Sequence, residues 1–223
     1  MLLLAADTSG KYGSIALARC GEDAGCEVLE VVPLIGGTFS AQLVPQIAAL
    51  LAKHGFSKQD IGAFAVASGP GSFTGLRVGL AAIKALAEVL GKPIAAVSLL
   101  EAVAIAGRVR GRVVAALDAG REEIYAGEYE IGNVSTLLRE RLLTREEFLA
   151  AADRHTVVTP DNNVADAVRG KGLQVEEIER PRSDVIARLG WKKVSAGETV
   201  SPEALEANYI RRSDAEIFSR SSF

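Results

Sequence analysis

The sequence predicts an α/β protein built from two lobes, each an open sheet flanked by helices. Short apolar runs joined by tight turns open the chain and recur near residue 112, and helical stripes alternate with buried strands after each group. The first strand of each group ends on an aspartate, Asp7 or Asp118. The length of 223 residues allows one large domain or two compact halves. We therefore expect an N-terminal lobe over residues 1–106 and a C-terminal lobe with the tail over residues 107–223.

The first half begins with three predicted strands separated by glycine-containing turns. A helix follows with Leu43, Ile47 and Leu50 on one stripe, and Gly55 suits a left-handed cap at its end. Pro45 either kinks this helix or marks its first turn. The expected strands are 2–7, 13–20, 26–33, 61–68 and 93–97, and the expected helices are 40–54, 73–90 and 98–106.

The second half repeats the pattern from a new hairpin. Capping boxes, in which a hydroxyl residue is followed three positions later by glutamate, predict helix starts at Ser98 and Thr144. The expected strands are 113–118, 123–131, 156–159 and 173–178, the expected helices are 144–152, 162–169 and 183–189, and the tail segments are 201–206 and 209–212.

Composition excludes several classes of protein. The formal charge of -3 and pI near 5.6 argue against a free-standing nucleic-acid binder. The apolar run at residues 2–6 is too short for a membrane span and lacks a basic leader. Cys20 and Cys26 are a poor framework for a secreted domain, which predicts a reduced, cytoplasmic protein. His54 and His155 are far apart in sequence, and no metal site is predicted.

The segment Gly69-Pro70-Gly71-Ser72-Phe73-Thr74-Gly75 lies between a buried strand and a helix start. Such a loop either directs backbone N–H groups at an anion or serves as a turn whose glycines need positive φ. The following helix carries three charged residues, Arg77, Lys84 and Glu88, and must be buried nearly all round. It is a core helix, a subunit interface or both, and we favour both. Gly75 and Gly79 would let a partner helix approach closely.

Asp7-Thr8-Ser9 and Asp118-Ala119-Gly120 end corresponding strands of the two halves. This symmetry predicts a pair of phosphate-facing turns. Asp7 would organise magnesium through water, and Ser9 or Gly120 would offer backbone donors. The alternative is that aspartate is simply a good turn residue.

Five segments together resemble the TsaB (YeaZ) family of bacterial threonylcarbamoyladenosine (t6A) synthesis. They are LLAADTS at 3–9, GPGSFTGLRVG at 69–79, AIKALA at 82–87, VSLLEA at 97–102 and LDAGREEIY at 117–125. The resemblance spans residues 2 to about 212. It implies an actin-like (ASKHA) ATPase fold with two ribonuclease-H-like lobes. It also implies a subunit that pairs with TsaD, recruits TsaE and works with TsaC on the tRNA adenosine next to the anticodon.

The resemblance places the partner interface on helices 40–51 and 73–90. Its candidate residues are Leu43, Ile47, Leu50, Phe73, Gly75, Leu76, Gly79 and Ile83, and the same helices would form a homodimer when the chain is alone. Asp7, Thr8, Ser9, Asp118 and Gly120 are the nucleotide or anion candidates. The resemblance implies no resident cofactor, with any ATP or ADP and Mg²⁺ bound weakly at the complex. Contact with tRNA is expected through the complex alone, and no membrane association is expected.

TsaD-like enzymes carry two metal-binding histidines at a helix start where this chain has Leu99 and Val103. Aliphatic side chains cannot ligate a metal, so the resemblance implies a non-catalytic paralogue with no catalytic residues. An independent ATPase or phosphotransferase using Asp7 and Asp118, and an M22-type metallopeptidase, are the alternatives. The chain departs from the family pattern at Phe39-Ser40-Ala41-Gln42 and at Ala207-Asn208-Tyr209-Ile210-Arg211.

Overall fold

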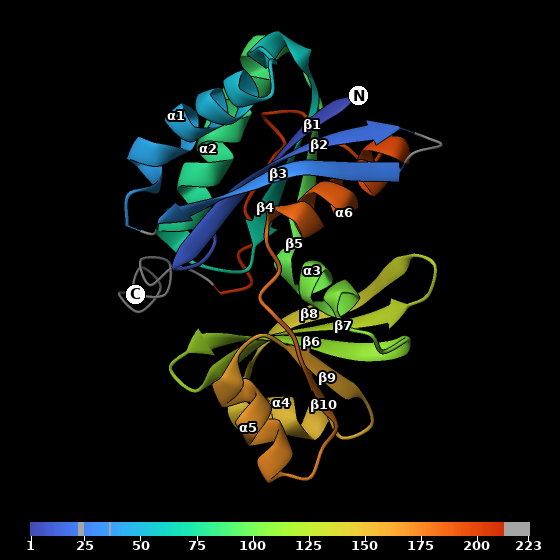
Figure 1. Ribbon diagram of the computed structural model, residues 1–223. Helices are drawn as coiled ribbons and strands as arrows, with labels where there is room; N and C mark the ends of the chain where they lie inside the picture. Colours follow the sequence, from blue (N-terminus) through green and yellow to red (C-terminus); the bar gives the residue numbers. More distant parts are fainter. Residues whose placement is uncertain (22–24, 36, 212–223) are drawn as a thin grey trace. The chain divides into compact units, whose positions relative to one another are not determined.

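The chain divides into two units in the computed structural model, which describes residues 1–21, 25–35 and 37–211 (Figure 1). Of the described residues, the first unit contains those of Met1–Ala102 and Pro181–Ala207, and the second contains Val103–Arg180 and residues 208–211. The described part of the chain forms one sheet in each unit. Two residues of the predicted turn at 21–23, Glu22 and Asp23, lie outside the described residues, as does Arg212 of the predicted tail segment.

The sheet of the first unit has five described strands in the order β3-β2-β1-β4-β5. Strands β1, β2 and β3 are antiparallel, whereas β4 and β5 run parallel to β1. The central strand β1 is buried along its whole length, as its unbroken apolar sequence predicts. The bounds are β1 Leu2–Asp7, β2 Tyr12–Gly21, β3 Gly25–Ile35, β4 Ile61–Gly69 and β5 Ile94–Ser98.

Helices cover both faces of this sheet (Figure 1). Helices α1 (Phe39–Lys53) and α2 (Phe73–Leu90) lie side by side on one face, and α6 (Ser183–Ser195) crosses the strands on the other. Gly55 has a positive φ just after the end of α1, as predicted, and Gly91 is the left-handed cap of α2. Pro45 lies inside α1 and not in its first turn. A short 3-10 helix, η1 (Lys58–Asp60), leads into β4.

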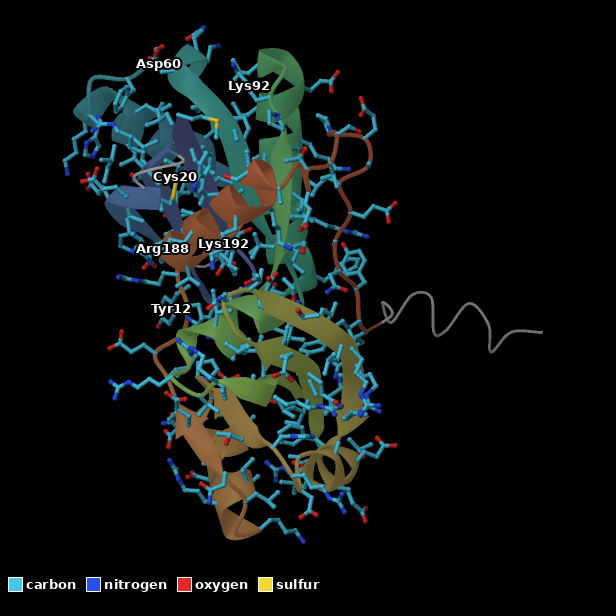
Figure 2. All side chains as sticks on the ribbon, turned by 90° about the vertical axis from the view of Figure 1, so that its right-hand side faces the viewer. Tyr12, Cys20, Asp60, Lys92, Arg188 and Lys192 are labelled. Atoms are coloured by element: carbon cyan, nitrogen blue, oxygen red, sulfur yellow. A yellow bond between two sulfur atoms is a disulfide. The ribbon has the colours of Figure 1, made fainter. Side chains whose placement is uncertain are left out.

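The observed division differs from the predicted lobes 1–106 and 107–223. The boundary falls inside α3 (Leu99–Ala106), and residues 181–207 return to the first unit. The reason is the buried side of α6, where Ile186, Ala187 and Gly190 pack against the face of the first sheet that α1 and α2 leave uncovered. A Cβ added at Gly190 would collide with the Ala65 side chain, so α6 approaches β4 closely. On the outer side of α6, Arg188 and Lys192 project away from the sheet (Figure 2).

The second unit repeats the topology of the first. Its described strands have the order β10-β9-β6-β7-β8, in which β6, β7 and β8 are antiparallel and β9 and β10 are parallel to β6 and to each other. Helices α4 and α5 pack against this sheet around Phe148, Val164 and Val168. The bounds are β6 Gly111–Gly120, β7 Glu123–Ile131, β8 Ser135–Thr144, α4 Arg145–Ala151, β9 Thr156–Thr159, α5 Asn162–Gly170 and β10 Val175–Glu177. The capping box at Thr144 and Glu147 is confirmed.

The structure also corrects two sequence expectations. Strand β8 was not predicted, because its charged centre Arg139-Glu140-Arg141 lacks β-branched residues; such charges are usual on an edge strand. Cys20 and Cys26, expected to be reduced, are joined by a disulfide (Figure 2). They are direct cross-strand partners in the β2–β3 hairpin, with Cα atoms 4.1 Å apart. None of the described helices is long and apolar enough to cross a membrane.

Candidate functional site

The turn after β1 is buried and closed on itself. Asp7, Thr8 and Ser9 are each at most 5% exposed. The Ser9 N–H donates to Asp7 Oδ1 at 2.9 Å, and the Thr8 hydroxyl donates to the Gly75 carbonyl at 2.7 Å. The backbone donor of Ser9, which the sequence predicts for a phosphate, thus has a carboxylate acceptor within its own turn.

The glycine-rich loop before α2 packs directly on this turn. A Cβ at Gly71 would lie 2.5 Å from the Ser9 carbonyl oxygen, and Cβ atoms at Gly75 and Gly79 would collide with Thr8. The Ser72 N–H donates to the Ser9 carbonyl at 2.6 Å, which ties the loop to the turn. Of the four glycines at positions 69, 71, 75 and 79, Gly69 alone has positive φ. The other three glycines do not need a positive φ, and the close approach of their backbone to Thr8 and Ser9 accounts for them.

The turn after β6 has the same internal bond as the turn after β1. The Gly120 N–H donates to Asp118 Oδ1 at 2.8 Å, which matches the Ser9–Asp7 contact. The symmetric placement read from the sequence is therefore present in the structure, as a pair of aspartate turns. The Gly120 N–H, like that of Ser9, therefore has an acceptor within its own turn.

Residues outside the turn after β6 also contact it. Asp118 is exposed and accepts a hydrogen bond from Asn163 at 2.7 Å, and its own N–H donates to Asp161 at 2.8 Å. Asp161 also pairs with Arg180 at 2.7 Å. In the part of the chain that the structure describes, no group of three or more His, Cys, Asp or Glu side chains is arranged to hold a metal ion.

Most of the predicted partner-interface residues face inward. Phe73 is 37% exposed, but the other candidates are buried in the first unit, because the large aliphatic stripe of each helix packs on its own sheet. The buried candidates are Leu43, Ile47, Leu50, Gly75, Leu76, Gly79 and Ile83. They cannot contact a partner in this arrangement, and the expectation that they do is corrected here.

The exposed sides of α1 and α2 carry a different set of residues. We call them the α1–α2 face: Val44, Ala48 and Ala52 of α1 with Phe73, Ala81, Ala85 and Val89 of α2. Val44 is 50% exposed and Val89 is 77% exposed. The Arg77 guanidinium lies 3.7 Å from the centre of the Phe73 ring at one end of this face. Helix α1, which the structure describes completely, exposes a single charged side chain, Lys53, which pairs with Glu30.

Leu99 and Val103, which the family resemblance aligns with metal-binding histidines, are interior residues. Leu99 is 3% exposed and Val103 is 1% exposed, and both lie on α3. Neither side chain has an atom that could ligate a metal.

Two sheets of one topology, each with an aspartate turn after its first strand, define an actin-like protein with two ribonuclease-H-like units. A family model described as TsaD, tRNA N6-adenosine threonylcarbamoyltransferase, matches residues 31–188. The chain is 32% identical to the Bacillus subtilis tRNA threonylcarbamoyladenosine biosynthesis protein TsaB, over 97% of this chain and 96% of that protein. It is 28% identical to Escherichia coli TsaB, over 96% of each.

Solved structures agree with these relatives. YeaZ from Pseudomonas aeruginosa superposes with a TM-score of 0.74 at 25% identity, covering 93% of this chain and 99% of that one. A P. aeruginosa protein described as similar to the peptidase YeaZ gives a TM-score of 0.77 at 28% identity, covering 94% and 99%. The chain belongs to the TsaB (YeaZ) family, and the predicted fold class is confirmed.

Proposed function

We propose that this chain is the non-catalytic partner subunit of t6A synthesis. It pairs with a TsaD-type transferase through the α1–α2 face, joins TsaE in a ternary complex and acts on tRNA through that complex in the cytoplasm. The names of its relatives support the pathway, since the B. subtilis and E. coli proteins are both tRNA threonylcarbamoyladenosine biosynthesis proteins.

The observation that carries the proposal is the composition of the α1–α2 face. An exposed helix surface in water is normally rich in charged residues, because apolar side chains there gain nothing from burial. Here Ala81, Ala85 and Val89 follow one another at four-residue spacing on α2, which also exposes Arg77 and Glu88, and Val44 and Ala48 are exposed on the neighbouring α1. Small side chains let a second helix pair approach closely, and contiguous apolar surface marks a protein–protein site.

The proposal that the chain is non-catalytic rests on α3 and on the aspartate turns. Leu99 and Val103 replace the metal-binding histidines that the family resemblance implies for TsaD. The N–H groups of Ser9 and Gly120 are occupied by Asp7 and Asp118, which weakens the alternative of an independent phosphotransferase.

A reconstituted reaction tests the function. TsaC, TsaD and TsaE from the same organism are combined with unmodified tRNA, ATP, threonine and bicarbonate, with and without this chain, and t6A is measured by mass spectrometry of the digested tRNA. We expect modification to depend on the chain. Unchanged modification in its absence would overturn the proposal.

A pair of variants tests the face. Ala85→Glu places a charge in the centre of the α1–α2 face, whereas Ala196→Glu places the same charge at the exposed end of α6. Burying an unpaired carboxylate costs about 2 kcal/mol or more, which is a loss of roughly 30-fold in affinity. We expect Ala85→Glu to abolish both self-association and TsaD binding in sedimentation velocity, and Ala196→Glu to leave both intact. If Ala85→Glu still assembles, the interface lies elsewhere.

Gly79 was a candidate for the partner interface, but the substitution Gly79→Glu would not test that interface. Any side chain at Gly79 collides with Thr8 inside the unit, so the variant would report on folding and not on partner contact.

A further inference from the structure

The β6–β7 turn of the second unit, residues 118–123, contacts an arginine from the chain's own tail. One guanidinium nitrogen of Arg211 donates to the Ala119 carbonyl at 2.9 Å, and the other donates to the Gly120 carbonyl at 3.3 Å. The second nitrogen also forms an ion pair with the Glu123 carboxylate. The guanidinium carbon lies 5.8 Å from the centre of the Tyr125 ring. We call residues 118–123 the receptor turn.

These contacts match the chemistry of a guanidinium in particular. Its N–H donors point outward in one plane, so it can bond two carbonyls and a carboxylate at once while an aromatic ring lies nearby. An ammonium group is a compact point charge and cannot reproduce this planar fork. The Arg211 side chain is 23% exposed and the Glu123 side chain 33% exposed, so the pair is largely shielded from water.

The backbone of the receptor turn is adapted to present acceptors. Gly120, Arg121 and Glu122 all have positive φ, between 57° and 70°, a conformation that residues with a Cβ rarely adopt. The Gly120 N–H is directed inward to Asp118, and Asp118 takes a further bond from Asn163. What the turn offers Arg211 is therefore two carbonyl oxygens and a carboxylate.

A second contact holds the chain three residues before Arg211. The Asn208 side chain donates to Glu140 of β8 at 2.6 Å, and the other oxygen of Glu140 accepts from the buried Tyr129 hydroxyl. Asn208 and Arg211 are three residues apart, so residues 208–211 are held at both ends. We call this segment the latch.

We propose that the receptor turn is a binding site for a guanidinium carried on a short peptide segment, and that the latch fills this site in cis. Opening the latch frees the site for an arginine presented in trans. This site is separate from the α1–α2 face, and the proposal does not depend on the function proposed above. A short tether gives Arg211 an effective concentration on the order of millimolar, so a competing segment must overcome that advantage.

The first experiment measures closure of the latch by amide hydrogen exchange of the latch itself, residues 208–211, in the full-length chain. Hydrogen bonds to a charged group hold such a contact closed by roughly 10- to 100-fold. Arg211→Lys and Glu123→Gln should each speed exchange of the latch by that factor, whereas Arg188→Ala on α6 should not. Exchange in Arg211→Lys that equals wild type would overturn the latch.

The second experiment measures the site itself. A fluorescent peptide of residues 207–211 is titrated into full-length Arg211→Ala, wild type and the double variant Arg211→Ala/Glu123→Gln. We expect the peptide to bind Arg211→Ala. It should bind the wild type more weakly, by the factor found in the exchange experiment, and it should not bind the double variant. A peptide in which lysine replaces arginine should fail in all three. Absence of binding to Arg211→Ala, or equal binding of the lysine peptide, would overturn the guanidinium site.

Discussion

Gly75 lies in the first turn of α2, against the carbonyl oxygen of Thr8. A methyl group at this position would collide with a backbone atom, and not with the movable end of a side chain. Thr8 follows the buried strand β1, and its hydroxyl is bonded to the Gly75 carbonyl. Gly75→Ala should therefore force β1 and α2 apart.

The size of the effect comes from two opposing contributions. Alanine is favoured over glycine inside a helix by about 1 kcal/mol. Overpacking in a fixed environment costs typically 1–3 kcal/mol, and a backbone contact of this kind belongs at the upper end of that range. We expect a net loss of about 2 kcal/mol in the free energy of unfolding. For a chain of this length, that loss lowers Tm by roughly 4–8 °C.

Urea titration and calorimetry of the purified variants measure this difference. Gly170→Ala is the matched control, since it lies at the end of α5 with no atom within 4 Å of an added Cβ. The control should be neutral or stabilised by up to about 1 kcal/mol. If Gly75→Ala were as stable as wild type, the close approach of α2 to Thr8 could not be the reason for the glycine.

Two further predictions concern buried polar groups. Burial raises the pKa of the Glu128 carboxyl, but hydrogen bonds from Arg139 and Arg112 lower it by more, so its pKa lies below the ordinary value. The resulting stabilisation is fully present above the unfolded-state pKa of about 4.3, and it is lost as the pH falls below that value through the lower folded-state pKa. Glu128→Gln should cost about 1–3 kcal/mol at pH 7 and less at pH 3.5 in urea titrations; an equal cost at both pH values would contradict this. Ser183→Ala removes a fully buried hydroxyl that donates to the Ser14 carbonyl at 2.5 Å, and should cost about 1–2 kcal/mol. The control is Ser195→Ala, at the exposed last residue of α6, which should change the free energy of unfolding by less than about 0.5 kcal/mol.

Local sequence signals predicted most of the elements. Apolar periodicity and glycine or capping residues gave the strands and helices of both units, and the paired Asp7 and Asp118 indicated a repeated turn. Strand β8 was missed because its charged sequence has weak strand propensity and is held in place by pairing with β7. The return of α6 to the first unit is a contact between distant parts of the chain, which periodicity does not report.

The candidate sites required the structure. Leu43 and Val44 are adjacent on α1, yet one faces the core and the other faces solvent, and an apolar helix does not reveal which side is covered. The glycines at 71, 75 and 79 indicate close approach of some group, but only the fold identifies that group as the turn at Thr8 and Ser9. The contact of Arg211 with the receptor turn joins residues about ninety positions apart. No local pattern in the sequence indicates such a contact.

The central claim is that this chain acts by assembling with a TsaD-type partner. Sedimentation velocity of an equimolar mixture with TsaD from the same organism tests it most directly. We predict a single species that sediments faster than either protein alone and contains both chains in equal amounts. Two boundaries that sediment independently at micromolar concentration would contradict the claim.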